Sequence, residues 1–338
     1  MKQRQVMPKV SIITRTKNRP LLLERTIKNV MEQSYSDFTM VIVNDGGDAR
    51  PIEKLLEKHK SLINGRTKLV SNKQSVGHGE ACNVGLRNSE SEYIVMLDDD
   101  DTWHKDFLKL TVNFLEESDF FGVVTASEIV NETYENDKII FVDRKPFLSF
   151  VHEIKLFSML GGNQFPNMAF LYRREALKKV GMYDKSASPL EDWDFNIRFL
   201  KNYDVHFIDK PLVYYHQRAK EKGDLANSIF LPNFHGAANT YLLNKYLRQD
   251  LAKDSLGAGF ISNISQQMNN VNAENLTFLS SLIRLSTSET HGGINHLHDR
   301  FTESESLLRG IDNNVRALLR SRIKKYAKRV INQTRRKR

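Results

Sequence analysis

The sequence predicts an α/β protein in which helices flank a mostly parallel sheet and an α-helical C-terminal extension follows. Short apolar runs alternate with segments of helical periodicity through about the first hundred residues. This alternation is typical of a parallel sheet with right-handed crossovers, whose ligand sites lie beyond the carboxyl ends of the strands. The composition agrees, because 338 residues that are 40% hydrophobic and 27% charged can build a large core.

The first half of the chain divides into strands and helices that alternate. Residues 10–14 (VSIIT) form the apolar run of a buried strand, and Pro20 suits the first turn of the helix that follows. The same reasoning predicts a strand at 39–43, a helix near 52–59, a strand at 68–71, a helix at 79–88, a strand at 93–97, a helix at 105–117 and a strand at 122–126.

The periodicity weakens between about 130 and 185. The elements expected from there on are mixed sheet and loops with a strand at 138–142, helices at 173–180 and 189–202, strands at 205–208 and 212–215, and a polar loop at 217–228. We therefore expect a folded domain at 1–228, whose halves divide near residue 126, then a helical extension at 229–319 and a basic tail at 320–338.

The net charge of +9 is concentrated at the end of the chain. Residues 320–338 contain ten Lys or Arg and no Asp or Glu, so that without these ten charges the balance of +9 becomes −1. Such a tail suits an amphipathic helix on anionic lipid, although polybasic tails also bind nucleic acid. Before the tail, apolar residues at 294–318 form a coiled-coil-like seam, which indicates either self-association or packing on the chain's own domain.

The cysteine content and the hydropathy predict a cytoplasmic protein. Cys82 is the only cysteine, which excludes an intramolecular disulfide and any cysteine-rich metal site. We see no signal peptide in the N-terminal residues, and no stretch approaches the roughly 18 apolar residues of a membrane span.

Acidic residues directly follow two of the predicted strands. Asp45 ends one strand, and Asp98, Asp99, Asp100 and Asp101 follow another. Crowded carboxylates repel one another unless a cation neutralises them, and their oxygens suit a hard divalent ion such as Mg²⁺ or Mn²⁺. The alternative is a solvated acidic loop that caps the next helix. The position at the carboxyl end of a parallel strand, beside Asp45, favours metal binding.

Four motifs follow one another along the chain. They are VSIITRTKNRP at 10–20, IVNDG at 42–46, EYIVMLDDDD at 92–101, and Glu191-Asp192 before a helix that contains tryptophan. In residues and order they resemble family 2 glycosyltransferases of the GT-A fold, over about residues 8–218. The resemblance implies a nucleotide-sugar donor, a divalent metal and inversion at the anomeric carbon. It also implies that the half at about 1–126 binds the nucleotide sugar and the half at about 127–228 binds the acceptor.

The resemblance implies roles for the residues of these motifs. Asp45 matches the acid that hydrogen-bonds the nucleotide base. Asp98 and Asp100 match the outer members of an Asp-x-Asp motif, with Asp100 as the direct metal ligand and Asp98 nearer the ribose or metal-bound water. The other residues assigned to nucleotide-sugar binding in these motifs are Thr14, Arg15, Lys17 and Asp99. Many relatives have Pro and an aromatic residue in place of Arg15 and Lys17, and this departure leaves dTDP and GDP open beside UDP, which is the default nucleotide.

Asp192 matches the catalytic base of the family. Its implied role is to take the proton from an acceptor hydroxyl as that oxygen attacks the anomeric carbon. The run Ser188-Pro189-Leu190-Glu191 has a capping-box pattern, which predicts that Glu191 bonds the backbone at the helix start and leaves Asp192 free to face the pocket. The alternative for Asp192 is a second acid in the first turn that interacts with the helix dipole.

Further candidates lie beside the motifs. His216 follows a predicted strand where GT-A enzymes often place a metal or diphosphate contact, and a surface histidine is the alternative. Arg218 lies in the polar loop and could clamp the diphosphate when that loop closes. We assign Asn163, Trp103 and Glu191 to the acceptor or sugar pocket, although core packing is the stronger explanation of Trp103 and a turn explains Asn163 almost as well.

Together these observations predict a metal-dependent, inverting glycosyltransferase of bacterial surface-polysaccharide synthesis, with Mn²⁺ or Mg²⁺ as cofactor. The expected partners are a nucleotide-sugar donor, a glycan acceptor that is lipid-linked at the inner leaflet, an anionic membrane surface bound through 320–338, and further copies of the chain bound through the C-terminal helices, with no nucleic acid. The rival predictions are a nucleotidyltransferase on a similar sheet, and a non-enzymatic protein that binds membrane or nucleic acid through its tail.

Overall fold

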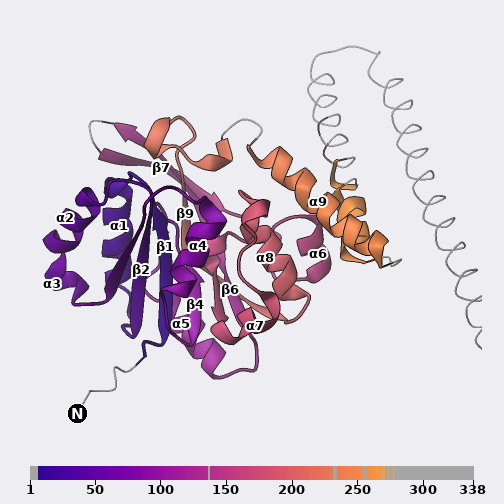
Figure 1. The fold of residues 1–338 in the computed structure, drawn as a ribbon, viewed down its shortest axis with the longest axis horizontal. Helices are drawn as coiled ribbons and strands as arrows, with labels where there is room; N and C mark the ends of the chain where they lie inside the picture. Colours follow the sequence, from indigo (N-terminus) through magenta and orange to yellow (C-terminus); the bar gives the residue numbers. More distant parts are fainter. Residues whose placement is uncertain are drawn as a thin grey trace, which may run out of the picture. The chain divides into compact units, whose positions relative to one another are not determined.

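The chain divides into two units, Met1–Ser265 and Gln266–Arg338, and the first, which is compact, contains all the elements described below (Figure 1). The predicted seam at 294–318 and the basic tail at 320–338 lie outside the described residues. The computed structural model describes residues 7–135, 138–230, 234–253, 257–266 and 268–270, together with residues 273 and 277.

The first half of the sheet is parallel, in the order β3-β2-β1-β4. Helices connect these strands, as the alternation of apolar runs predicts (Figure 1). The elements of this half are β1 (Val10–Thr16), α1 (Pro20–Met31), β2 (Phe38–Asp45), α2 (Arg50–Lys58), α3 (Lys60–Ile63), β3 (Thr67–Asn72), α4 (His78–Arg87) and β4 (Tyr93–Met96).

The second half of the sheet is mixed. β8 lies antiparallel between β4 and β6, and β9 runs parallel to β6. β5 pairs antiparallel with β9, and β7 pairs antiparallel with β6. The elements of this half are β5 (Thr102–Trp103), α5 (Phe107–Glu116), β6 (Gly122–Glu135), β7 (Lys138–Pro146), α6 (Leu156–Gly161), β8 (Phe170–Arg173), α7 (Leu177–Val180), α8 (Glu191–Leu200) and β9 (Val205–Gln217), followed by α9 (Phe234–Ala252).

Three elements of this half differ from the predicted ones. β6 continues to Glu135, well beyond the predicted end at residue 126, because the polar second part of the strand pairs with both β7 and β9. The two strands predicted at 205–208 and 212–215 are one strand, β9. The helix predicted at 173–180 is the end of β8 followed by one 3-10 turn, Arg174–Ala176, and the short α7.

Helices α1 and α4 pack closely on the parallel part of the sheet. α1 begins at Pro20 and buries one apolar face, and each fully buried aliphatic side chain contributes roughly 1.5–3 kcal/mol relative to an exposed one. α4 approaches β1 closely at Gly85, where a Cβ atom would lie 2.3 Å from Cγ2 of Ile13. The fully buried aliphatic side chains of α1 are Leu22, Leu23, Ile27 and Val30.

α9 is joined to the domain by charged groups. Nζ of Lys245 lies 2.8 Å from a carboxylate oxygen of Asp184 and 2.7 Å from one of Asp194, at the start of α8. The Tyr246 hydroxyl donates to Asp194 at 2.9 Å. In the described part of the chain, no helix combines the length and the apolar character that crossing a bilayer requires.

Candidate active site

The loops after β1, β2 and β4 open onto one cavity of about 780 Å³, a volume within the roughly 300–1,000 Å³ of small-molecule sites. Segment 215–230, which begins in β9, supplies the opposite wall. We call this space the donor cavity. Among the residues assigned from the sequence, those that line it are Arg15, Lys17, Asp45, Asp98, Asp99 and Asp100.

Arginine side chains neutralise the aspartates after β4. Nη1 of Arg19 donates to Oδ1 of Asp99 at 2.8 Å, and its Nη2 donates to Oδ2 of Asp100 at 3.1 Å. The fully buried Arg218 also donates to Oδ2 of Asp100. Arg218 therefore does lie at this site, where it contacts the carboxylate assigned to metal binding.

Glu132 of β6 extends this network behind the aspartates. It accepts a hydrogen bond from Nη1 of Arg25 at 2.8 Å and one from Nη1 of Arg218 at 2.7 Å, and Nδ1 of His216 lies 2.9 Å from its Oε2. Burial opposes ionisation of Glu132, but the hydrogen bonds from His216 and Arg25 outweigh it and lower its pKa to about 2.

The aspartates differ in how easily they ionise. Burial opposes ionisation of Asp100, but Arg19 and Arg218 hold its pKa below the ordinary value. Burial raises the pKa of Asp99 to about 6, although Arg19 opposes the shift. Burial and the charge of Asp100 raise the pKa of Asp101 well above its ordinary value, and its Oδ2 has no hydrogen-bond partner among the described residues.

The loop at 218–227 is tied to the same groups. Nε of Arg19 donates to the carbonyl oxygen of Asp224 at 2.6 Å. Nδ2 of Asn227 donates to Oδ2 of Asp100 at 3.2 Å. The polar loop expected at 217–228 therefore covers the aspartates and is held there by contacts to them.

His216 lies behind the donor cavity and does not line it. Its Nε2 is 2.8 Å from Oγ1 of Thr102 and its Nδ1 is bonded to Glu132, so both ring nitrogens have protein partners. Burial lowers the pKa of His216 despite the Glu132 carboxylate. To ligate a metal, a ring nitrogen would have to leave one of these partners.

Asp45, at the end of β2, holds the loop that precedes α4. Two side chains and two backbone amides of this loop donate to its carboxylate at 2.7 to 3.2 Å. Burial opposes ionisation, but these bonds outweigh it and lower the pKa of Asp45. The donors are Asn72, Ser75, Val76 and Gly77.

Asp192 lies in the first turn of α8, beside Asn163. Nδ2 of Asn163 donates to its Oδ2 at 2.9 Å, and the backbone amide of Trp193 donates to its Oδ1 at 2.8 Å. Nδ2 of Asn196 donates to Oδ1 of Asn163 at 3.0 Å and so fixes the orientation of that amide. Burial and the charge of Glu191 raise the pKa of Asp192 to about 7, which suits proton transfer near neutral pH.

Arg15 connects the donor cavity with the start of α8. Nε of Arg15 donates to Oδ1 of Asp98 at 3.0 Å, and its Nη1 lies 4.0 Å from Oε1 of Glu191. Asp192 itself does not line the cavity. The charges of Asp98 and Arg15 nevertheless affect its pKa, so the two sites interact electrostatically.

The capping-box prediction for the start of α8 is wrong. α8 begins at Glu191 with Leu190 as its N-cap residue, and no side chain caps it. Ser188 instead follows a 3-10 turn at Lys185–Ala187. Oε1 of Glu191 lies 4.0 Å from Nη1 of Arg15 and from Nδ1 of His78, so this buried carboxylate faces side chains rather than the backbone. The charge of Arg15 and burial lower the pKa of His78 to about 3, so Arg15 is the cationic partner of Glu191 near neutral pH.

Of three further residues that the sequence assigned to the site, two are core residues and one lines the donor cavity. Thr14 is fully buried in β1 and does not line the donor cavity. Trp103 is also a core residue, since it stacks on Phe107 at 4.4 Å and donates to the carbonyl oxygen of Met168 at 3.0 Å. Lys17 lines the cavity and is exposed.

Four site residues, Arg19, Arg25, Glu132 and Asn227, were not predicted from the sequence. Arg19 belongs to the opening motif, so its place there was a usable signal. The other three lie in segments without a motif. Only the folded structure reveals them, because Arg25 and Asn227 donate to Asp100 and Glu132 accepts from Arg218.

Asp98 and Asp100 fit a divalent ion by the chemistry of their donor atoms. Both line the donor cavity, and no described residue donates a hydrogen bond to Oδ2 of Asp98 or to Oδ1 of Asp100. Mg²⁺ usually takes one or two carboxylates together with substrate phosphates and water. Within the described ranges, no group of three or more His, Cys, Asp or Glu side chains could hold an ion. The donor set thus suits an ion that arrives with phosphate oxygens.

The family model described as Glycosyl transferase family 2 matches residues 11–181, which is just over half of the chain. An uncharacterized glycosyltransferase of Haemophilus influenzae is 27% identical over 214 residues, which cover 62% of this chain and 77% of that protein. The uncharacterized glycosyltransferase YwdF of Bacillus subtilis is 26% identical over 209 residues, which cover 61% of this chain and 74% of that protein.

Solved structures share the fold. Residues 1–349 of TarS from S. aureus, in complex with UDP-GlcNAc, align with a TM-score of 0.54 and 20% identity over 71% of this chain and 66% of that one. The mannosyltransferase PcManGT of Pyrobaculum calidifontis, in complex with GDP-Man and Mn²⁺, aligns with a TM-score of 0.53 and 16% identity over 89% of this chain and 81% of that one.

Proposed function

Since this chain belongs to glycosyltransferase family 2 and has the GT-A fold, we propose that it is a metal-dependent, inverting enzyme that moves a sugar from a nucleotide sugar, by preference a UDP-sugar, to a glycan acceptor. One observation carries the proposal. The donor cavity gathers Asp45, Asp98 and Asp100 with two arginines, Arg15 and Arg19, and Arg15 links it to the helix that holds Asp192.

The cationic groups of the cavity would bind the diphosphate of the donor. Arg15, Arg19 and Lys17 line the cavity, and the first two contact carboxylates there. Guanidinium groups bind phosphate through strong charge-assisted hydrogen bonds, so an entering diphosphate can replace these carboxylates as their acceptor. A divalent ion held with the phosphates at Asp98 and Asp100 would add positive charge that stabilises the departing diphosphate.

Asp192 would act as the base on the acceptor. Its carboxylate takes the hydroxyl proton while the hydroxyl oxygen bonds to the anomeric carbon and the bond from that carbon to the phosphate oxygen breaks. A pKa of about 7 leaves a large fraction of Asp192 ionised at neutral pH and makes it a stronger base than an ordinary aspartate. Asn163 and the Trp193 amide orient the two carboxylate oxygens.

Two similar structures support the choice of donor class, because one contains UDP-GlcNAc and the other GDP-Man with Mn²⁺. We further propose that the acceptor is a lipid-linked glycan of a cell-surface polysaccharide, reached at the cytoplasmic face of the membrane. The ten cations of residues 320–338 support attraction to anionic lipid. The apolar seam at 294–318 supports oligomers, which would strengthen weak tail binding through avidity.

Product identity tests this proposal directly. The purified full chain is incubated with Mn²⁺ and, in turn, UDP-, GDP- and dTDP-sugars, and nucleoside diphosphate and pyrophosphate are both measured. We expect slow hydrolysis of at least one donor to nucleoside diphosphate, with water as the acceptor, and a rise in Tm with the matching nucleotide. Release of pyrophosphate would instead identify a nucleotidyltransferase.

Two variants distinguish the loss of the catalytic base from the effect of replacing any aspartate by asparagine. Asp192→Asn should lower turnover by roughly a hundredfold or more, while the nucleotide still raises Tm as in the wild type. Asp119→Asn, at an exposed aspartate that does not line the donor cavity, should leave both unchanged. Equal turnover in Asp192→Asn and the wild type would remove Asp192 from the mechanism.

A further inference from the structure

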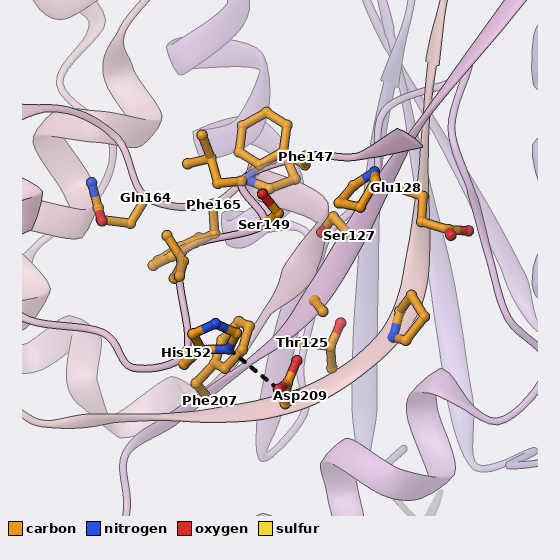
Figure 2. A pocket seen from close by; sticks show the side chains of 16 residues that line it. Thr125, Ser127, Glu128, Phe147, Ser149, His152, Gln164, Phe165, Phe207 and Asp209 are labelled. Carbon is orange, nitrogen blue, oxygen red and sulfur yellow. Dashed lines mark hydrogen bonds and ion pairs between the residues drawn. The ribbon is translucent and has the colours of Figure 1, made fainter. Parts of the chain in front are cut away.

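A second, smaller cavity of about 220 Å³ lies between β6, β9 and two loops (Figure 2). We call it the β6–β9 pocket. Its volume is below the roughly 300–1,000 Å³ of sites for drug-sized ligands, so it suits a single ring and not a whole nucleotide. The residues that matter below are Thr125 and Ser127 of β6, Phe207 and Asp209 of β9, Phe147 and His152 of the loop after β7, and Gln164 and Phe165 of the loop before β8.

The strand pairing explains why a hollow forms there. The register between β6 and β9 shifts on both sides of Ala126, so β9 has extra residues opposite this short part of β6. Such irregularities disrupt the ladder locally and re-aim side chains, and they are frequent beside active sites.

Two buried hydroxyl groups line the pocket without partners. Thr125 is 1% exposed and Ser127 is 9% exposed, yet neither hydroxyl has a hydrogen-bond partner among the described residues. Figure 2 shows both side chains between the Phe147 side of the pocket and the pair of His152 and Asp209. A buried hydroxyl without a partner lowers stability, so its presence in a cavity wall points to a ligand that supplies the partner.

The other lining groups define the chemistry of that ligand. The half-buried Phe147 and Phe207 give apolar aromatic surface, while Phe165 is almost fully buried. The amide nitrogen of Gln164 already donates to the carbonyl oxygens of Ser158 and Gly162, so this amide offers its oxygen as an acceptor. No lysine or arginine is among the described lining residues, whereas Glu128 and Asp209 are acidic, so the pocket disfavours an anion. A purely apolar ligand would leave both hydroxyls unpaired. A sugar ring meets every condition, because its C–H faces pack on aromatic rings and its hydroxyls both donate and accept hydrogen bonds.

The pocket adjoins both parts of the active site. The rings of Phe147 and Tyr215 meet edge-on with centroids 6.1 Å apart, and Tyr215 lines the donor cavity. Gln164 directly follows Asn163, whose amide holds the carboxylate of Asp192. A glycan whose reactive hydroxyl is at Asp192 can therefore extend along this loop into the pocket.

We propose that the β6–β9 pocket binds one sugar unit of the acceptor glycan, next to the unit that receives the new sugar. The acceptor role rests on the proposed transferase function, whereas the binding of a neutral sugar rests on the pocket alone. Thr125 and Ser127 are the residues that select a hydroxyl-bearing ring.

Saturation-transfer NMR on the full chain tests the proposal. The probes are glucose, galactose, mannose, N-acetylglucosamine and N-acetylgalactosamine, each with and without saturating UDP or whichever nucleotide raises Tm. We expect transfer to at least one sugar, unchanged by the nucleotide, and at least a fivefold loss in the double variant Thr125→Val, Ser127→Ala. Because these hydroxyls have no partner, the double variant should keep or raise the Tm of the wild type.

Ser118→Ala is the matched control, since its hydroxyl is also buried without a partner among the described residues but lies outside the pocket. It should leave the sugar signal unchanged, and Ser127→Ala alone serves if the double variant is unstable. The proposal is overturned if no probe sugar gives a signal, if the signal survives in the double variant, or if the nucleotide displaces the sugar. A sugar signal without any nucleotide effect on Tm would instead contradict the transferase proposal and leave a sugar-binding pocket.

Discussion

Replacing Asp192 by asparagine should change the stability of the fold by an amount that depends on pH. Burial and the charge of Glu191 raise the pKa of Asp192 from 3.8 to about 7. The native state therefore keeps a proton that the unfolded chain releases above pH 3.8. For a raised pKa, the stability is fully present below the unfolded value and is lost as pH rises through the folded value. Asparagine is uncharged at every pH, so the variant does not lose this stability as the pH rises.

The size of the effect follows from the shift. About three pKa units at about 1.36 kcal/mol each give a loss of about 4 kcal/mol for the wild type above pH ~7. Near pH ~5.5 only about 2 kcal/mol is lost, because the native carboxyl is still mostly protonated. The stability of Asp192→Asn relative to wild type should therefore increase by about 2 kcal/mol between pH ~5.5 and pH ~8.5.

Urea unfolding of both proteins at the two pH values measures this difference. Changes in the hydrogen bonds to Asn163 and Trp193 affect the variant equally at both pH values and cancel in the comparison. Asp119→Asn, at an exposed residue, is the control and should show no such increase. If the relative stability of Asp192→Asn stayed constant or fell at the higher pH, Asp192 would ionise without penalty, and the argument for a base tuned to neutral pH would fail.

Three further results are expected. Turnover of the wild type should rise with pH and level off above about 7, because Asp192 must be ionised to accept a proton, and the pH profile of nucleoside diphosphate release measures this. Glu132→Gln should lower the free energy of unfolding by about 3 kcal/mol at neutral pH, because His216 and Arg25 outweigh burial and lower the pKa of Glu132 from 4.5 to about 2. In urea titrations that loss should shrink as the pH falls from about 4.5 towards 2, and a constant loss would contradict the charge argument. EDTA should abolish transfer but leave Tm unchanged, because Arg19 and Arg218 neutralise Asp100 without an ion. Full activity in EDTA would contradict the metal proposal.

Much of the donor half could be predicted because its signals are local. An apolar run such as 10–14 predicts a buried strand by itself, and parallel strands bring their carboxyl ends to one edge. The meeting of Asp45 with Asp98 and Asp100 follows from that topology alone. The resemblance then supplied Asp192, which no periodicity connects to the strand ends.

The second half of the sheet was harder to predict because its polar residues are buried in pairs. The part of β6 after residue 126 carries Ser127 and Glu132 on a strand that faces a cavity and a charge network, so the apolar alternation that marks a strand is missing. The spacing of residues along the sequence also does not predict which cationic side chain pairs with which carboxylate. Arg25 and Glu132 are 107 positions apart and form their pair only in the folded chain.

Arginines balance most of the negative charge of this acidic site. Four buried or partly buried carboxylates, those of Asp98, Asp99, Asp100 and Glu132, meet four arginines, at positions 15, 19, 25 and 218. Beside them, Asp101 accepts a hydrogen bond from the backbone amide of His216. The raised pKa of Asp101 favours its neutral form, which leaves four negative charges against four positive ones. In the proposed reaction, a nucleotide sugar would bring its diphosphate into this balanced site together with a dication, so the net charge of the site would change little on binding. The guanidinium groups of Arg15 and Arg19, which line the donor cavity, could then contact carboxylates in the free protein and phosphates in the complex. Donor binding would thus be an exchange of partners for charges that are already desolvated.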